Sequence, residues 1–176
     1  TSQPNIWAAG DCAETVQLAT GEPFWVSLAT VASKQGRVAG TNITGGDVAF
    51  AGTFGTTITK AGPIEISRTG ATETELAGSE INVATAKSNA LTATRYYPTN
   101  EAMTVKLIAE VDSGRLLGGQ IVGGAGAAMR INVLATALQA GMTIDDVAAL
   151  DLAYAPPFSM VWDPILLAAR NLCKKC

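Results

Sequence analysis

The sequence predicts an α+β fold, in which helices pack on a mostly antiparallel sheet, preceded by a strand and a helix of a separate unit. Three observations support this fold class. The helical pattern of the first part of the chain ends at Gly45-Gly46-Asp47, and the residues that follow are rich in Thr, Val, Ile and Gly. Short runs typical of strands follow, and the last part of the chain has apolar residues at helical spacing.

The amino-terminal unit is predicted to contain one strand and one helix. Residues 5–9, Asn-Ile-Trp-Ala-Ala, form an apolar run that ends at Gly10-Asp11, which indicates a buried strand followed by a turn. Apolar residues near helical spacing then predict a helix over about residues 27–42. The glycines at 45–46 divide the chain into two predicted domains, residues 1–46 and residues 50–176.

The second domain is expected to begin with its sheet. Gly62-Pro63 and Asp112-Ser113-Gly114 are favourable turns between strands. Thr72 with Glu75 three residues later has the spacing of a capping box, which predicts a short helix. The predicted strands are residues 53–59, 64–67, 81–86, 91–97, 103–111 and 116–122.

Helices are predicted for the rest of this domain. The first covers residues 127–140, and a short second one is opened by Thr143 with Asp146 at its third position. The last helix begins between Ser159 and Pro164 and ends at Leu172.

Composition excludes several classes of protein. Hydrophobic residues make up 48% and charged residues 15%, which is typical of a chain that folds around a core. The net charge of −3, without a basic cluster, excludes nucleic acid as an expected partner. No apolar run approaches the roughly 18 residues of a membrane span. Three cysteines, an odd number, give no disulfide framework and favour a reducing, cytoplasmic compartment.

The absence of histidine restricts the possible chemistry. It excludes Ser/His/Asp and Cys/His nucleophile arrangements, an imidazole base and most zinc sites. Any reaction in which the chain takes part must therefore use other side chains or a cofactor.

The Gly10-Asp11 turn is the first candidate site. A carboxylate on a tight turn after a strand can accept hydrogen bonds from sugar-like hydroxyls, and Gly10 allows the backbone to approach a ligand closely. The alternative is that Asp11 only caps the turn that follows it.

Three ordered motifs give the chain a family resemblance. TSQPNIWAAGDCAE, PFWVSLATVASKQGRVAGTNITGG and YAPPFSMVWDPILLAAR together resemble the flavin-dependent pyridine nucleotide-disulfide oxidoreductases. The chain is most similar to the branch of coenzyme A-disulfide reductases, NADH oxidases and NAD(P)H-dependent sulfur or polysulfide reductases. The resemblance implies that residues 1–46 are the end of an FAD-binding domain and that residues 50–176 are a dimerisation domain.

The resemblance also implies roles for individual residues. Asp11 matches the aspartate that binds the ribityl chain of FAD, with Gly10 beside it. Leu28 and Ala29 match the start of the helix whose backbone amides approach the flavin ring. Since the histidine that related reductases use is absent, Tyr154 and Tyr97, with Tyr96 as the alternative to Tyr97, match tyrosines that reach across a homodimer toward the partner's redox cysteine.

The implied function is that of the carboxyl-terminal portion of an FAD-dependent NAD(P)H oxidoreductase. Its substrate would be a small disulfide or sulfur compound, or oxygen, and NAD(P)H would bind in a domain outside this chain. The chain alone would be inactive. A different hypothesis is a stand-alone dimerisation or binding module, and a small metal protein built on the terminal cysteines is disfavoured by the lack of further ligands.

Two further motifs have more than one interpretation. Cys173 and Cys176 flank two lysines, which can lower a thiol pKa, so the pair is either a redox or metal-binding tail or an incidental feature of a frayed end. Gly124-Ala125-Gly126 partly matches a dinucleotide-binding loop, but the third glycine position holds Met129, which favours a simple strand-to-helix turn.

Overall fold

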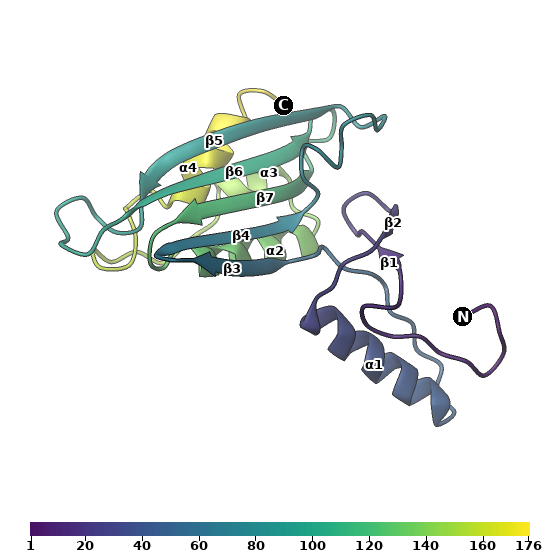
Figure 1. Ribbon diagram of the computed structural model, residues 1–176. Helices are drawn as coiled ribbons and strands as arrows, with labels where there is room; N and C mark the ends of the chain where they lie inside the picture. Colours follow the sequence, from purple (N-terminus) through teal and green to yellow (C-terminus); the bar gives the residue numbers. More distant parts are fainter. The chain divides into compact units, whose positions relative to one another are not determined.

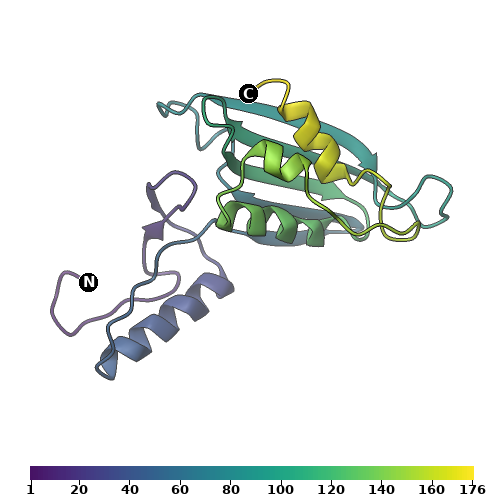
Figure 2. The same ribbon diagram turned by 180° about the vertical axis from the view of Figure 1, so that it is seen from behind.

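The computed structural model describes all residues from Thr1 to Cys176. The chain forms two compact units, residues Thr1–Gly55 and Thr56–Cys176. Figures 1 and 2 show a small amino-terminal unit and a larger unit in which helices cover one face of a sheet. None of the helices has the length and apolar character needed to cross a lipid bilayer.

The first unit is built around helix α1, Ala29–Ile43. Two short strands, β1 (Thr15–Val16) and β2 (Pro23–Phe24), pair with each other in antiparallel fashion. The predicted helix over residues 27–42 is thereby confirmed to within two residues at each end.

The predicted buried strand at residues 5–9 is wrong. This segment has no strand structure, and Ile6 and Trp7 are exposed. A strand needs a neighbour that satisfies its backbone groups. Within this chain the Ile6 carbonyl accepts only local hydrogen bonds, from Thr1, and no strand lies alongside the segment.

The second unit contains a five-stranded antiparallel sheet in the order β3-β4-β7-β6-β5. The hairpin predicted at Asp112-Ser113-Gly114 joins β6 to β7, and Gly114 has the positive φ of +67° that this turn requires. The strands are β3 (Thr57–Ala61), β4 (Ile64–Gly70), β5 (Val83–Leu91), β6 (Ala102–Glu110) and β7 (Leu116–Gly123).

Helices cover one face of this sheet (Figure 2). A 3₁₀ turn, η1 (Ala128–Arg130), leads into α2 (Ile131–Gln139), which packs on β4 and β7. The short helix α3 (Ile144–Ala148) and the last helix α4 (Pro164–Leu172) pack on each other, and α4 lies on β5 and β6. The core between sheet and helices contains the fully buried side chains of Val105, Leu107, Ile121, Leu134, Val147, Ile165 and Leu172.

Glycine in β7 allows the helix layer to approach the sheet. A Cβ atom on Gly119 would lie 2.5 Å from Cδ1 of Leu134 in α2 and 3.2 Å from Cδ2 of Leu107. A side chain at this position would therefore force the Leu134 side chain, or the helix that carries it, to move, and protein cores have little free space for such a shift.

Two predictions in the sheet region are wrong. Residues 91–97 are not a strand, because β5 is one continuous strand that ends at Leu91. Beyond it the chain turns: the Tyr97 N–H donates to the Thr94 carbonyl, and the Asn100 N–H donates to the Tyr97 carbonyl. The capping box of Thr72 and Glu75 is formed, but the residues that follow Thr72 form a series of turns instead of a helix.

The other elements agree with the sequence, with shifted ends. Strand β3 begins at Thr57, not at residue 53, since Thr53 instead bridges to Gln17 in the first unit. The three predicted helical segments are confirmed as η1 with α2, α3 and α4. Thr143 and Asp146 form the capping box of α3, and Asp163 caps α4 ahead of Pro164.

Candidate functional site

The Gly10-Asp11 turn is held against helix α1. The Gly10 N–H donates to the side-chain oxygen of Gln35, a buried residue of α1, at 2.8 Å, and Gly10 has a φ of +84°. The hydroxyl of Ser27 donates to a carboxylate oxygen of Asp11 at 2.5 Å, while the Trp25 indole N–H donates to the Asp11 carbonyl at 2.9 Å. The turn is therefore anchored by its backbone, and the Asp11 side chain remains exposed.

The bond between Ser27 and Asp11 brings the turn to the start of α1. Leu28 is the N-cap residue of this helix and has no side-chain cap, and the first helical turn, beginning at Ala29, contains no acidic residue. The first N–H groups of a helix carry a partial positive charge and remain available to an anionic or electron-rich group. The structure thus places Gly10, Asp11, Leu28 and Ala29 within one small region of the first unit.

The predicted tyrosines lie on two loops of the second unit. Tyr97 is half-buried in the loop between β5 and β6, whereas its neighbour Tyr96 is 73% exposed. Tyr154 is 44% exposed in the segment between α3 and α4. The Asn100 side chain donates to the Tyr97 carbonyl at 2.6 Å, which fixes the backbone at Tyr97.

Hydrogen bonds join these two loops directly. The Thr94 N–H donates to the Pro156 carbonyl at 3.1 Å, and the Thr94 hydroxyl donates to the Ser159 carbonyl at 3.2 Å. We call residues 92–101 and 154–163 the tyrosine loops. The structure thus brings together two segments that are more than fifty residues apart in the chain.

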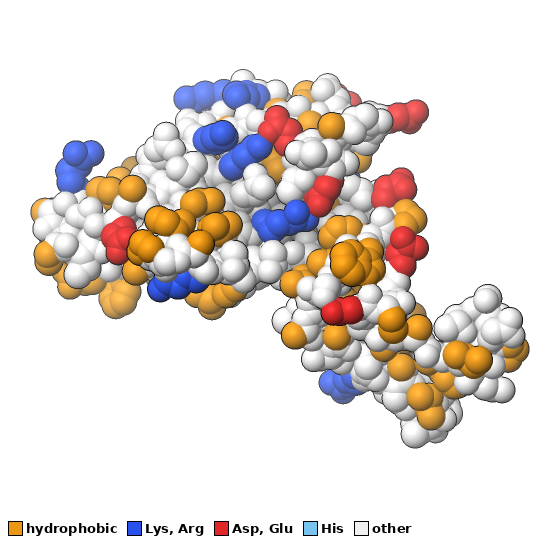
Figure 3. Space-filling model, viewed as in Figure 1, with side chains coloured by type: hydrophobic (Ala, Val, Ile, Leu, Met, Phe, Trp, Pro, Cys, Tyr) orange, Lys and Arg blue, Asp and Glu red, His pale blue; other side chains and the backbone are white.

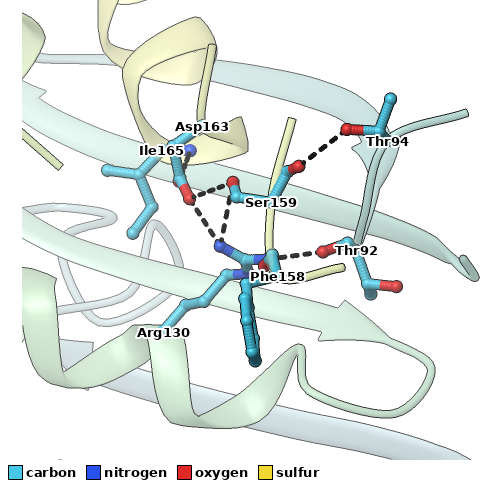
Figure 4. Close-up of polar contacts among 7 residues, drawn as sticks. All are labelled: Thr92, Thr94, Arg130, Phe158, Ser159, Asp163 and Ile165. Carbon is cyan, nitrogen blue, oxygen red and sulfur yellow. Dashed lines mark hydrogen bonds and ion pairs between the residues drawn. The ribbon is translucent and has the colours of Figure 1, made fainter. Parts of the chain in front are cut away.

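Arg130 is the main connection between the tyrosine loops (Figure 4). Its Nη2 donates to the Thr92 carbonyl and to the Phe158 carbonyl, each at 2.7 Å. Its Nη1 forms an ion pair with Asp163 at 2.5 Å. Neither the sequence motifs nor the family resemblance singled out this arginine.

The ion pair lies out of solvent. The side chains of Arg130 and Asp163 are 14% and 8% exposed. Asp163 also accepts a hydrogen bond from the Ser159 hydroxyl at 3.0 Å and caps α4 by accepting one from the Ile165 N–H at 2.9 Å. Because buried charges need partners, Asp163 compensates Arg130 and at the same time ties it to the start of α4.

Exposed apolar side chains lie on the tyrosine loops and beside them. A pocket of about 510 Å³ lies beside Arg130 and is lined in part by Thr92, Glu101, Met129 and Phe158. Phe158 is 75% exposed, and Met129, Val161 and Trp162 are exposed as well. Figure 3 shows hydrophobic atoms gathered at this end of the sheet. Exposed apolar clusters of this kind are typical of protein interfaces.

The terminal cysteines do not have the predicted reactive environment. Burial, together with the Asp145 carboxylate, raises the pKa of Cys173 to about 11, and the same two causes raise the pKa of Cys176. Lys175 is directed to the Thr85 carbonyl instead, at 2.8 Å. The expectation that flanking lysines lower these thiol pKa values is therefore wrong, and no cluster of metal-ligating residues is present.

The Gly124-Ala125-Gly126 segment is a turn between β7 and η1. The carboxylate of Glu65 accepts a hydrogen bond from the Ala128 N–H at 3.0 Å, and this backbone hydrogen bond lowers the pKa of Glu65. The Ala128 N–H at the start of η1 is thus already bonded to a side chain of the protein and is not free for a phosphate. This geometry agrees with the turn interpretation of the glycines.

Comparison with known proteins defines the family. Residues 56–164 match the family model described as "Pyridine nucleotide-disulphide oxidoreductase, dimerisation domain". The chain belongs to the pyridine nucleotide-disulphide oxidoreductase family. Its second unit is accordingly this family's dimerisation domain, and the predicted α+β fold is confirmed.

Individual relatives are similar over almost the whole chain. It is 45% identical over 172 residues to a CoA-dependent NAD(P)H sulfur oxidoreductase of Pyrococcus furiosus, covering 98% of this chain and 39% of the relative. It is 31% identical over 168 residues to a coenzyme A disulfide reductase of Staphylococcus epidermidis, covering 95% and 38%. A solved NAD-dependent persulfide reductase from A. fulgidus superposes with a TM-score of 0.93 at 42% identity, covering 99% and 32%. The chain therefore spans less than half the length of each.

The sequence pointed to some residues of these sites and missed others. The resemblance made Asp11, Tyr154 and Tyr97 candidates, which stay predictions, and nothing in the sequence indicated Gln35, Arg130 or Ser159. Asp163 had a usable signal, since an aspartate directly before a proline is typical of a helix start. Arg130 had no such signal, because its partners are two main-chain carbonyls and an aspartate that are all distant in sequence.

Proposed function

We propose that this chain is the carboxyl-terminal portion of an FAD-dependent NAD(P)H oxidoreductase that reduces a disulfide or sulfur substrate, such as coenzyme A disulfide or a polysulfide, or else oxygen. The observation that carries the proposal is the extent of the similarity to the sulfur oxidoreductase of P. furiosus, which covers 98% of the chain. It includes both the Asp11 turn and the tyrosine loops.

The first unit has the groups needed to bind part of FAD. The exposed Asp11 carboxylate is suited to accept hydrogen bonds from the ribityl hydroxyls, and Gly10 leaves room for their approach. The uncapped N-terminus of α1, at Leu28 and Ala29, is suited to stabilise negative charge on the flavin ring. When bound, FAD supplies hydride acceptance from NAD(P)H and electron transfer to the acceptor.

The flavin assignment is tested in the full-length protein. Asp11→Ala removes the carboxylate, and we expect the purified variant to retain less FAD, as measured by its absorbance relative to protein. Asp47→Ala is the matched control, because Asp47 is an exposed aspartate of the same unit whose side chain forms no hydrogen bond or ion pair. Equal flavin content in the two variants would overturn the assignment of Asp11.

The tyrosine loops provide hydrogen-bond donors for the acceptor reaction. Reduction of a disulfide breaks the S–S bond and consumes two electrons and two protons, so the departing thiolate needs a donor. A phenol hydroxyl donates a hydrogen bond while remaining uncharged near neutral pH, and the chain has no histidine for this role. We assign the role to Tyr154 and Tyr97, acting toward the redox cysteine of a partner subunit.

The proposed assembly is a homodimer in the cytoplasm, with neither nucleic acid nor a membrane as partner. The exposed apolar side chains around the tyrosine loops support association, because a two-fold interface would bury them. The odd number of cysteines, three, supports a reducing compartment. Sedimentation of the full-length protein at micromolar concentration tests the dimer, which a monomer would contradict.

The same protein distinguishes the enzyme from a non-catalytic dimerisation module. We expect the full-length protein to contain FAD and to oxidise NAD(P)H with a disulfide, a polysulfide or oxygen, while residues 1–176 alone remain inactive. A full-length protein that associates but contains no flavin would favour the stand-alone module.

A further inference from the structure

We propose that Arg130 is a positioning residue that sets the relative placement of Tyr97 and Tyr154. This inference rests on the proposed function, because it assigns to Arg130 a part in the acceptor reaction of the same tyrosine loops. Arg130 itself would not touch the substrate.

The first argument is that the tyrosine loops have little rigidity of their own. Neither residues 92–101 nor residues 154–163 contain a helix or a strand. Apart from Arg130, the bonds that join them are the two made by Thr94, to Pro156 and Ser159. Loops without regular structure keep a fixed geometry only where other groups hold their backbone.

The second argument is the geometry of the guanidinium group. A single Nη2 atom reaches both the Thr92 and the Phe158 carbonyls, and Nη1 reaches Asp163 (Figure 4). The planar fork of arginine binds several acceptors at fixed angles, whereas a lysine ammonium is a compact charge on a flexible stem. Arg130 thus joins the base of one tyrosine loop to the other loop.

The third argument is the short path from these anchors to the tyrosines. Thr92 precedes Tyr97 by five residues, and Phe158 follows Tyr154 by four. Asp163 in turn belongs to the N-terminus of α4, whose residues Ile165 and Leu172 are fully buried in the core. The backbone near the tyrosines is thereby held in a fixed position relative to the core of the domain. A catalytic donor requires such a fixed position.

The decisive variant is Arg130→Lys in the full-length enzyme. Lysine keeps a positive charge beside Asp163, so no buried charge is left unpaired, but its single nitrogen cannot hold both carbonyls and Asp163 at the positions that two guanidinium nitrogens reach. We expect the disulfide-reducing half-reaction to slow by about tenfold or more, while flavin reduction by NAD(P)H changes by less than about twofold. Arg68→Lys is the matched control, because Arg68 forms an ion pair with Glu75 away from the tyrosine loops, and we expect it to change neither step.

A double-mutant cycle separates positioning from a general loss of structure. If Arg130 acts through the two tyrosines, Arg130→Lys should cost almost nothing further in a background that carries both Tyr97→Phe and Tyr154→Phe. Fully additive losses, or equal slowing of both half-reactions, would overturn the inference. If Arg130→Lys does not fold, Thr94→Val, which removes only the Thr94–Ser159 bond, takes its place and should slow the same half-reaction by about threefold.

The outcomes also distinguish this inference from the proposed function. If Tyr154→Phe slows the disulfide step and Arg130→Lys does not, the positioning role alone is overturned. If Tyr154→Phe and Tyr97→Phe both leave the disulfide step unchanged, no donor remains to be positioned, and the role proposed for the tyrosine loops is overturned together with that of Arg130.

Discussion

Replacement of Asp163 by asparagine tests the buried ion pair that underlies the tyrosine loops. Asparagine keeps the size of the side chain and an oxygen that can cap α4 by accepting the Ile165 N–H. It removes the negative charge beside Arg130, although the arginine keeps its bonds to the Thr92 and Phe158 carbonyls. The variant therefore isolates the charge from the helix cap.

The expected loss follows from burial. Removing one partner of a buried ion pair costs about 3–5 kcal/mol, whereas an exposed pair contributes less than about 1 kcal/mol. Asp163 is 8% exposed and Arg130 is 14% exposed, so the buried value applies. Because two carbonyls still accept hydrogen bonds from the guanidinium, we expect the loss in the free energy of unfolding to be at the lower end of this range, about 3 kcal/mol.

The assay is equilibrium unfolding in urea, followed by the fluorescence of Trp162, which adjoins Asp163. Trp7 and Trp25 are replaced by phenylalanine in every protein compared, so that the signal reports on the second unit alone. The urea concentration at the midpoint of unfolding should fall, while the slope of the free energy of unfolding against urea concentration stays the same.

Asp146→Asn is the control for this assay, because Asp146 is an exposed acid in the capping box of α3 and its replacement should have a much smaller effect. A loss for Asp163→Asn below about 1 kcal/mol would show that the pair behaves like a surface contact and would refute the reasoning.

Four further results are expected. In the full-length enzyme, Tyr154→Phe should slow the disulfide-reducing half-reaction by about tenfold or more and leave flavin reduction nearly unchanged; stopped-flow measurement of both steps decides. Gly119→Ala should destabilise the second unit by about 1–3 kcal/mol in urea unfolding, because its Cβ would lie 2.5 Å from Leu134, whereas Gly36→Ala in α1 meets no atom within 4 Å and should not destabilise the protein. The Glu65 carboxylate, whose pKa is lowered in the folded state by its hydrogen bond from Ala128, stabilises the fold above its unfolded pKa and ceases to do so as pH falls. The stability difference between the wild type and Glu65→Gln should therefore shrink as the pH falls below the ordinary glutamate pKa of 4.5. Cys173, whose pKa is raised by burial from the ordinary 9.0 to about 11 in the folded state, should react with iodoacetamide at pH 8 about a hundredfold more slowly than in the urea-unfolded chain, since only the thiolate reacts.

The sequence was sufficient for most of the architecture because local physical chemistry determines it. The hairpin at Asp112-Ser113-Gly114 follows from the turn preference of its residues, and the start of α3 follows from the capping box of Thr143 and Asp146. The same local logic failed at residues 5–9, because an apolar run becomes a strand only when a neighbour pairs with it. It also failed at residues 91–97, where turn hydrogen bonds took the place of a sheet partner.

The residues of the candidate sites also differ in whether the sequence alone could indicate them. Asp11 and Tyr154 lie in motifs that are contiguous in sequence, so a resemblance could indicate them, and it offered Tyr97 as the companion of Tyr154. Arg130 acts through the carbonyls of Thr92 and Phe158, which any residue type can supply, and through an aspartate 33 positions away. No pattern of side chains encodes such contacts, because they exist only once η1, the tyrosine loops and the start of α4 are packed against the sheet.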